Sequence, residues 1–185
     1  MQTPDKEYRE IQLTQGKVAK VSPHRFEELN KLRWHARWCP HKKSFYAEIN
    51  LPSADGKWVG LRTSMHRMIL GLPIGDKRIG DHVNGDTLDN QDTNLRICTP
   101  AQNTRNRRVD CDSKSGFKGV CCHASHGRDM WEAKIICDGK YVYLGRFPFT
   151  EEGKIQAARA YDAAALKHHG EFAYLNFPHE HGRTR

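Results

Sequence analysis

Residues 81–96 read DHVNGDTLDNQDTNLR, and this stretch decides how the first half of the chain folds. Residues 79–83 are predicted to form a strand, Asn84 and Gly85 are typical hairpin turn residues, and residues 95–98 predict the returning strand. A capping box follows directly, with proline at the first helical position, and predicts a helix. The order strand, turn, strand, helix gathers a carboxylate, an imidazole and several amides in one short segment.

The polar groups of this segment suit the hydrolysis of a phosphodiester bond, which requires a base to activate water and a hard cation to hold the phosphate. Neutral His82 can take the proton of the water, and Asn94 can accept the proton of its other ring nitrogen. Asp81 and Asn103 offer oxygen ligands of the kind that Mg²⁺ or Mn²⁺ accepts. The spacing therefore predicts a nuclease site with His82 and Asn94 as catalytic residues and Asp81 and Asn103 as metal ligands.

Alternatives stay open for these residues. Consecutive residues of a strand project to opposite faces, so local bending decides whether Asp81 and His82 converge. Asn, Asp and Gly also dominate ordinary turns, so any one of them can belong to a loop without chemistry. Upstream, His66 could be a further site residue, although a histidine packed beside a helix is the simpler explanation.

The composition predicts a globular protein with a polyanionic partner. The 185 residues include 30 Lys and Arg against 22 Asp and Glu, a net charge of +8, and the pI is near 9.3. This excess favours nucleic acid over a membrane surface, through phosphate contacts and counterion release. The first twenty residues are polar and no run of eighteen apolar residues occurs, so we expect a cytoplasmic protein without signal peptide or membrane span. The six cysteines form no CxxC pair, which favours reduced thiols over disulfides or structural zinc.

Residues 8–62 alternate short apolar runs with turn signals, which predicts a small antiparallel sheet with one hairpin closed by Asp55 and Gly56. Short helices are predicted after Ser22 and over residues 65–71. The apolar side chains expected in the core of this region are Phe26, Leu29, Trp34 and Trp38.

The last third of the chain predicts a second unit, which begins after a polar linker without periodicity. Thr150 is expected to cap a helix that ends near Gly170, and its recurrent alanines would let it lie close on a sheet. The three strands of that sheet are predicted at residues 119–123, 130–137 and 141–147.

The first of these regions carries a longer pattern, formed by Asp81-His82-x-Asn84-Gly85-x-x-x-Asp89-Asn90, Asn94-Leu95-Arg96 and Gln102-Asn103. This pattern resembles the HNH family of ββα-metal endonucleases, above all the subgroup of intron-associated homing endonucleases from phages and bacteria. The resemblance covers most of residues 11–108. It implies that His82 is the general base, that Asp81 and Asn103 bind the metal and that Asn94 supports the site. The family name expects histidine at the last position, and Asn103 is a variant that the subgroup uses.

The second unit carries the pattern Gly119-Val120, Trp131-x-Ala133-x-Ile135, Tyr143-Leu144-Gly145-Arg146-Phe147, Ala157-Ala158-Arg159-Ala160-Tyr161-Asp162-x-Ala164-Ala165 and Leu175-Asn176-Phe177-Pro178. It resembles the plant ethylene-response-factor (AP2/ERF) DNA-binding domain, which also occurs fused behind HNH nucleases. The resemblance implies a three-stranded sheet in the major groove of DNA. The DNA-binding residues that it implies are Lys118, His123, Arg128, Trp131, Lys134, Tyr141 and Tyr143, with Arg146 as a candidate phosphate contact.

Departures from this family pattern leave the DNA target open. Cys121, His123 and Ile136 replace family arginines, so a changed or relaxed base preference is expected. Trp131 could instead pack within the sheet, and Lys134 or Arg128 could be solvated charges. A zinc site of Cys121, Cys122, His123 and His126 is the weaker alternative, because these residues belong to a predicted strand and turn of the second unit. Basic residues that would track phosphates near the linker are Arg105, Arg107, Arg108 and Lys114.

Together these features predict the α+β class. Residues 8–108 would form an HNH endonuclease domain with an N-terminal small sheet, 109–115 a linker, and 116–178 a DNA-binding domain of three antiparallel strands packed on one helix. The predicted function is Mg²⁺- or Mn²⁺-dependent nicking of double-stranded DNA by a homing endonuclease, monomeric on DNA, in the cytoplasm of a bacterial or phage-infected cell. The alternatives are a sequence-specific transcriptional regulator with an inactive nuclease domain, and a structural nucleic-acid-binding protein without sequence preference.

Overall fold

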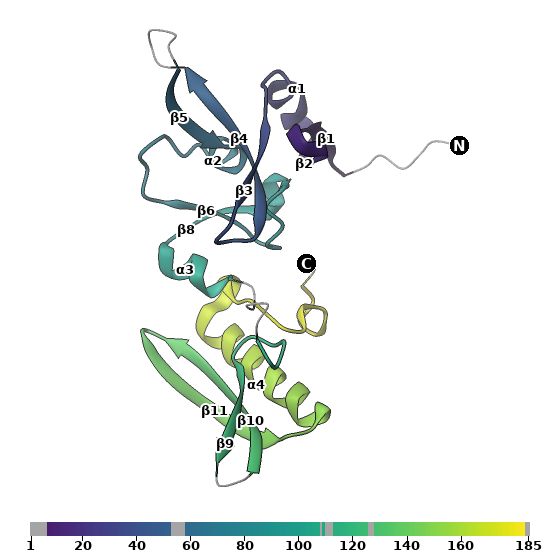
Figure 1. The fold of residues 1–185 in the computed structure, drawn as a ribbon, viewed down its shortest axis with the longest axis vertical. Coiled ribbons are helices and arrows are strands. Elements are labelled where there is room, and N and C mark those ends of the chain that lie inside the picture. Colours follow the sequence, from purple (N-terminus) through teal and green to yellow (C-terminus); the bar gives the residue numbers. More distant parts are fainter. Residues whose placement is uncertain (1–6, 53–57, 108, 110–112, 126–127, 184–185) are drawn as a thin grey trace, which may run out of the picture. The chain divides into compact units, whose positions relative to one another are not determined.

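The computed structural model describes residues 7–52, 58–107, 109, 113–125 and 128–183 (Figure 1). The chain forms two units, Met1–Pro100 and Ala101–Arg185, and apolar cores are found in both. Helices and antiparallel strands occur together, so the predicted α+β class is confirmed. The predicted domain limits at 108 and 116 stay a prediction. Within the described part of the chain, no helix has the length and apolar character needed to cross a bilayer.

The first unit consists of small sheets joined by short helices. The first sheet contains β1 (Arg9–Gln12), β2 (Val18–Val21) and β7 (Asp89–Asn90). The second contains β3 (His35–Cys39), β4 (Ser44–Pro52) and β5 (Trp58–Ser64). The third pairs β6 (Ile79–His82) with β8 (Leu95–Cys98). The helices are α1 (Phe26–Leu29) and α2 (Met65–Ile69), with 3-10 turns η1 (Thr14–Gly16), η2 (Pro23–Arg25) and η3 (Asp92–Asn94).

The prediction of one antiparallel sheet over residues 8–62 was wrong. These residues divide between two sheets, and β2 pairs in parallel with β7, with Lys20 opposite Asp89 and Val21 opposite Asn90. That pairing joins segments far apart in the sequence, so no local apolar pattern can reveal it. The predicted turn at Asp55 and Gly56 lies outside the described residues.

The core of the first unit holds one of the two tryptophans assigned to it. Trp34 is buried and its indole N–H donates to Leu29 O at 2.9 Å. Trp38 is 47% exposed, so its assignment to the core was wrong. It lies near the end of β3, where its ring packs on cross-strand Phe45 with centroids 4.9 Å apart.

The second unit has the predicted three-stranded sheet and long helix. Its elements are α3 (Pro100–Arg105), β9 (Val120–Ser125), β10 (Arg128–Cys137), β11 (Lys140–Pro148), α4 (Glu151–His169), η4 (Gly170–Phe172) and η5 (Pro178–His181). The strands run antiparallel in the order β11-β10-β9, and α4 lies along one face of this sheet (Figure 1). The expected C-terminal architecture is thereby confirmed.

Helix α4 begins and ends where the sequence predicts. The hydroxyl of Thr150 accepts from Gly153 N at 3.1 Å, and Gly170 ends the helix with a φ of 55°. Ala157, Ala158 and Ala165 are fully buried against the sheet. Their small side chains let the helix approach the strands closely, as predicted.

The loop before β9 depends on this close approach. Gly119 has a φ of +75°, and a Cβ at this position would overlap the ring of Tyr161 and lie 2.7 Å from Lys134 O. Gly116, three residues earlier, has a similar φ of +71° but open space around it. The two glycines therefore differ in packing and not in backbone conformation.

We predict that Gly119→Ala destabilises the second unit far more than Gly116→Ala. Both variants place alanine at positive φ, which costs about 1–2 kcal/mol, whereas only Gly119→Ala adds a steric overlap, which costs about 1–3 kcal/mol more. Urea denaturation of the full chain measures the difference. Equal losses in the two variants would show that α4 does not lie as close to the sheet as the structure has it.

Candidate functional site

Strand β6 ends in the carboxylate and imidazole that the sequence selected. Asp81 and His82 are both buried, at 7% and 4% exposure. In the β6–β8 pair Asp81 lies opposite Arg96, and both Nε and Nη2 of that guanidinium lie 2.9 Å from Asp81 Oδ2. The buried carboxylate thus already faces a positive charge. Its hard oxygens fit a divalent cation chemically, but such a cation would have to share the carboxylate with Arg96.

The imidazole of His82 is oriented by an amide. Its Nε2 lies 3.3 Å from Asn90 Oδ1, and Asn90 is 1% exposed. Asn90 Nδ2 donates to Leu88 O at 3.1 Å, which turns the amide oxygen towards the ring. An oxygen there can only accept, so Nε2 carries the proton and Nδ1 is the basic nitrogen. Burial lowers the pKa of His82, which keeps the imidazole neutral at pH 7.

The orienting contact that we predicted for Asn94 is made by Asn90 instead. Asn94 Oδ1 accepts from Asn84 N at 2.9 Å, and its Nδ2 donates to Asn84 Oδ1 at 3.0 Å and to Asp89 O at 2.8 Å. Asn94 is the last residue of η3 and directly precedes β8. Its hydrogen bonds to Asn84 and Asp89 connect the two ends of the loop between β6 and β8. It supports the loop that carries the site, and a catalytic role for it stays a prediction.

His66 lies against His82. Whether His66 belongs to the site was a question that the sequence left open. The two rings have centroids 4.8 Å apart, and Tyr46 lies 5.8 Å from His66 and 6.3 Å from His82. His66 Nε2 is 3.3 Å from the Ser64 hydroxyl. A Cβ at Gly80 would lie 2.6 Å from His66 Cδ2, so this glycine makes room for the ring. Burial, with the nearby charges of His82 and Arg67, lowers the pKa of His66 to about 3.

The predicted metal ligands belong to different units. Asp81 lies in the first unit. Asn103 lies on α3 in the second unit, where it is half-buried. The two-ligand metal site therefore stays a prediction. Within the described ranges, no three His, Cys, Asp or Glu side chains are grouped so as to hold a metal ion. His126 of the alternative zinc set lies outside the described residues.

The sheet of the second unit has one face covered by α4 and, among the described residues of this unit, one uncovered face. Side chains alternate along β10, so Trp131, Ala133 and Ile135 are buried while their neighbours point the other way. On the uncovered face, Ile136 and Tyr143 are 51% and 59% exposed. We call this surface the open face; its residues are His123, Glu132, Lys134, Ile136, Tyr141, Tyr143 and Arg146.

The open face combines aromatic and basic groups. Tyr141 is 73% exposed, and Lys134 Nζ lies 5.5 Å from the centroid of its ring. Arg146 Nε is 3.3 Å from Glu132 Oε2, and Arg146 Nη2 is 3.0 Å from His123 Nε2. Large exposed side chains next to positive charges are typical of a binding surface.

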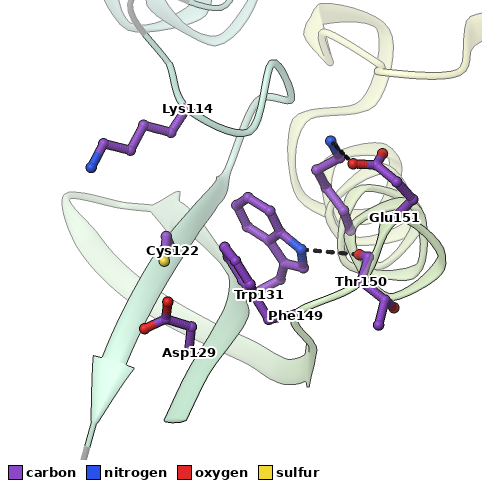
Figure 2. A pocket seen from close by; sticks show the side chains of 8 residues that line it. Lys114, Cys122, Asp129, Trp131, Phe149, Thr150 and Glu151 are labelled. Carbon is purple, nitrogen blue, oxygen red and sulfur yellow. Dashed lines mark hydrogen bonds and ion pairs between the residues drawn. The ribbon is translucent and has the colours of Figure 1, made fainter. Parts of the chain in front are cut away.

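Trp131 does not belong to the open face, and its role as a DNA contact stays a prediction. It is 6% exposed, its indole N–H donates to Thr150 O at 3.1 Å, and it stacks on Phe149 at 4.7 Å (Figure 2). It packs between sheet and helix, which is the alternative that the sequence left open. A pocket of about 450 Å³ lies beside Trp131. Among its lining residues, Lys154 Nζ donates to Glu151 Oε1 at 2.8 Å.

Two further predicted contacts, Lys118 and Arg105, bind other groups of the second unit. Lys118 Nζ donates to Arg105 O at 2.6 Å and to Arg107 O at 2.7 Å, so its ammonium fixes the end of α3. Arg105 Nη2 reaches Asp138 Oδ1 at 3.9 Å. The side chain of Arg128 and all of Arg108 lie outside the described residues. DNA contacts by these residues stay predictions.

Known proteins match one segment of the chain. Over 65 residues, 34% of this chain, it is 43% identical to the ethylene-responsive transcription factor WRI1 of Arabidopsis thaliana, of which the match covers 14%. The AP2-like ethylene-responsive transcription factor PLT2 of the same plant is 45% identical over 65 residues, 34% of this chain and 10% of the relative. APETALA2-like protein 2 of Oryza sativa subsp. indica is 43% identical over 65 residues, 34% of this chain and 13% of the relative.

About a third of the chain is therefore of AP2/ERF type. The three-stranded sheet packed on a long helix is consistent with this similarity. The chain spans only 10–14% of the length of these relatives. No family model and no solved structure matches the chain. The resemblance of the first unit to HNH nucleases has no support from these comparisons and stays a prediction.

We predict that acid destabilises the first unit through His66. The pKa of its folded form, about 3, lies below the ordinary value of 6.5. Below about pH 6.5 the unfolded chain therefore binds more protons than the folded chain, and the free energy of unfolding falls as the pH drops. Between about pH 7 and pH 5 the loss from His66 is about 2 kcal/mol. Urea denaturation at the two pH values measures it.

A His66→Gln variant should lose most of this acid dependence. His41→Gln is the matched control, because His41 is exposed and its removal leaves the core unchanged. An acid dependence that persists in His66→Gln would assign the effect to other groups, such as neighbouring His82.

Proposed function

We propose that this protein binds double-stranded DNA with sequence preference, through the open face of the second unit. The observation that carries the proposal is this face, where Ile136, Tyr141 and Tyr143 are exposed beside Lys134 and Arg146. The names of the similar plant proteins describe transcription factors, and the net charge of +8 suits a polyanion. A role as a transcriptional regulator follows if binding is the whole activity.

The chemistry of the open face suits the major groove. The groove of B-DNA is about 12 Å wide and admits strands of a sheet. Lys134 would contact a phosphate, while the rings of Tyr141 and Tyr143 would cover sugars or thymine methyl groups. The helix on the other face keeps the strands rigid and holds these side chains in a fixed array.

A second candidate function is metal-dependent hydrolysis of DNA by the first unit. The observation that favours it is the buried, neutral imidazole of His82, oriented by Asn90 and adjacent to Asp81. In this proposal His82 Nδ1 takes the proton of the attacking water, and Asn90 Oδ1 accepts from Nε2–H and stabilises the imidazolium that forms. Asp81 and Asn103 would hold Mg²⁺ or Mn²⁺, which would neutralise charge on the phosphate.

The two candidate functions complement each other. A nuclease with one site per chain would nick DNA as a monomer, and the second unit would select where it cuts. By its resemblance to intron-associated homing endonucleases, such an enzyme would belong to a mobile element in the cytoplasm of a bacterial or phage-infected cell. The regulator alternative differs only in the first unit, which would then lack hydrolytic activity.

We predict that the full chain binds duplex DNA in a salt-dependent manner and that Lys134 contributes. In EDTA, which prevents cleavage, fluorescence anisotropy between about 50 and 200 mM salt gives the slope of affinity against salt. Lys134→Ala should weaken binding and lower the slope by about one. Lys167→Ala removes the same charge from an exposed position of α4 and should have less effect. Equal effects would contradict binding through the open face.

We also predict that the chain nicks supercoiled plasmid when Mg²⁺ or Mn²⁺ is present. His82→Ala should abolish nicking, with a loss of about 100-fold or more because the general base is removed. EDTA should have the same effect on the wild type. DNA binding by His82→Ala, measured in parallel, shows that the variant is folded. Tight binding without cutting by the wild type would favour the regulator.

A further inference from the structure

Three charged or polar side chains form a connected set across all three strands of the open face. Glu132 of β10 lies opposite Arg146 of β11 in the sheet, and His123 comes from β9 on the other side. Arg146 Nε lies 3.3 Å from Glu132 Oε2, and Arg146 Nη2 lies 3.0 Å from His123 Nε2. His123 Nδ1 is 3.8 Å from the same Glu132 oxygen. The three groups thus close a triangle on the sheet surface.

These contacts use only one edge of the guanidinium. Arginine has five N–H donors, and Nε with the nearer hydrogen of Nη2 forms its side edge. The two nitrogens of that edge, Nε and Nη2, are the atoms in contact with Glu132 and His123. The end edge, formed by Nη1 and the remaining hydrogen of Nη2, has no partner among the residues that the structure describes. Arg146 is 43% exposed at its side chain, so this edge is accessible.

The same contacts indicate which ring nitrogen of His123 carries the proton. An arginine nitrogen can only donate, so Nε2 of His123 accepts and the ring proton is on Nδ1. Nδ1 is the nitrogen near Glu132 Oε2, so the same tautomer suits both contacts. Glu132 is held by the central strand and its side chain is 15% exposed. The carboxylate is therefore a fixed support against which Arg146 is oriented.

Orientation is the main effect of this arrangement. Ion pairs at a protein surface contribute little to stability. An unrestrained arginine, in contrast, loses much of its side-chain entropy when it is ordered on a ligand. A guanidinium held in advance loses less of this freedom on binding. The set is thus suited to recognition more than to the stability of the sheet.

We propose that Arg146 reads a guanine in bound DNA, with Glu132 and His123 as positioning residues. The end edge of a guanidinium matches the O6 and N7 acceptors of guanine. A phosphate fits the same edge, but its negative charge would be repelled by the Glu132 carboxylate beside it, whereas the base edge is neutral. The inference rests on the proposed DNA binding of the second unit and names the base that it selects.

Selection of binding sites from a randomised duplex tests this assignment. The full chain in EDTA is used as wild type, Arg146→Lys, Glu132→Gln and Lys134→Gln. We expect the wild type to require guanine at one position at least. Arg146→Lys keeps the charge but lacks the fork, so discrimination at that position should fall about 10-fold or more while the salt slope is unchanged. Glu132→Gln should weaken the same preference, although Arg146 is intact.

The control Lys134→Gln should lower affinity for all sequences and leave the preference unchanged. If Arg146→Lys and Glu132→Gln retain the guanine preference, or weaken all sequences alike, Arg146 is not a base reader and the inference is overturned. The DNA-binding function would survive that result. If the wild type shows no salt-dependent binding to any duplex, both the function and the inference fail. Unfolding curves of each variant confirm that it is folded.

Discussion

The packing of α4 on one face of its sheet is the constraint on which the second unit depends. Ala157, Ala158 and Ala165 are fully buried, so the helix lies near the strands and takes up the apolar side chains of β10. Because side chains alternate along a strand, burying one set commits the other set to the opposite surface. The open face therefore follows from the core.

A buried carboxylate completes this packing. Asp162 of α4 is 0% exposed and accepts from the backbone nitrogens of Asn176 and Phe177, each at 2.8 Å. Burial raises its pKa, while these hydrogen bonds act in the opposite direction. The contact fixes the segment after α4 to the helix, and Asn176 in turn accepts from Lys118 N at 2.8 Å. The buried carboxylate of Asp162 thus holds the segment after α4 in place, and its hydrogen-bond capacity is satisfied by these partners.

The first unit uses buried polar groups in another way. Its short strands enclose Asp81, His82 and His66, and burial disfavours the charged form of each histidine. Keeping imidazoles neutral in this way reduces stability in acid, yet it also supplies a base at neutral pH. A core alone would be formed more simply by apolar side chains. This arrangement is the physical reason to test the first unit for hydrolysis even though the comparisons concern the second.

The sequence by itself determined the elements that depend on neighbouring residues. Thr150 and Gly170 mark the ends of α4, the alternation in β10 and the turn at Asp138 mark a hairpin, and residues 79–98 form the predicted pair of strands. Apolar periodicity, caps and turn residues act within a few positions, so their pattern can be recognised without coordinates.

Only the tertiary structure decided which side chains meet across long sequence distances. In the folded chain His82 contacts Asn90 and not Asn94, and β2 pairs with β7. The side chain of Trp131 lies in the core. The tertiary structure also brought Glu132, Arg146 and His123 together, because strand register sets such neighbours and a shift of one residue would send each side chain to the other face. Register is fixed by the packing of the whole sheet, and no local run of residues contains it.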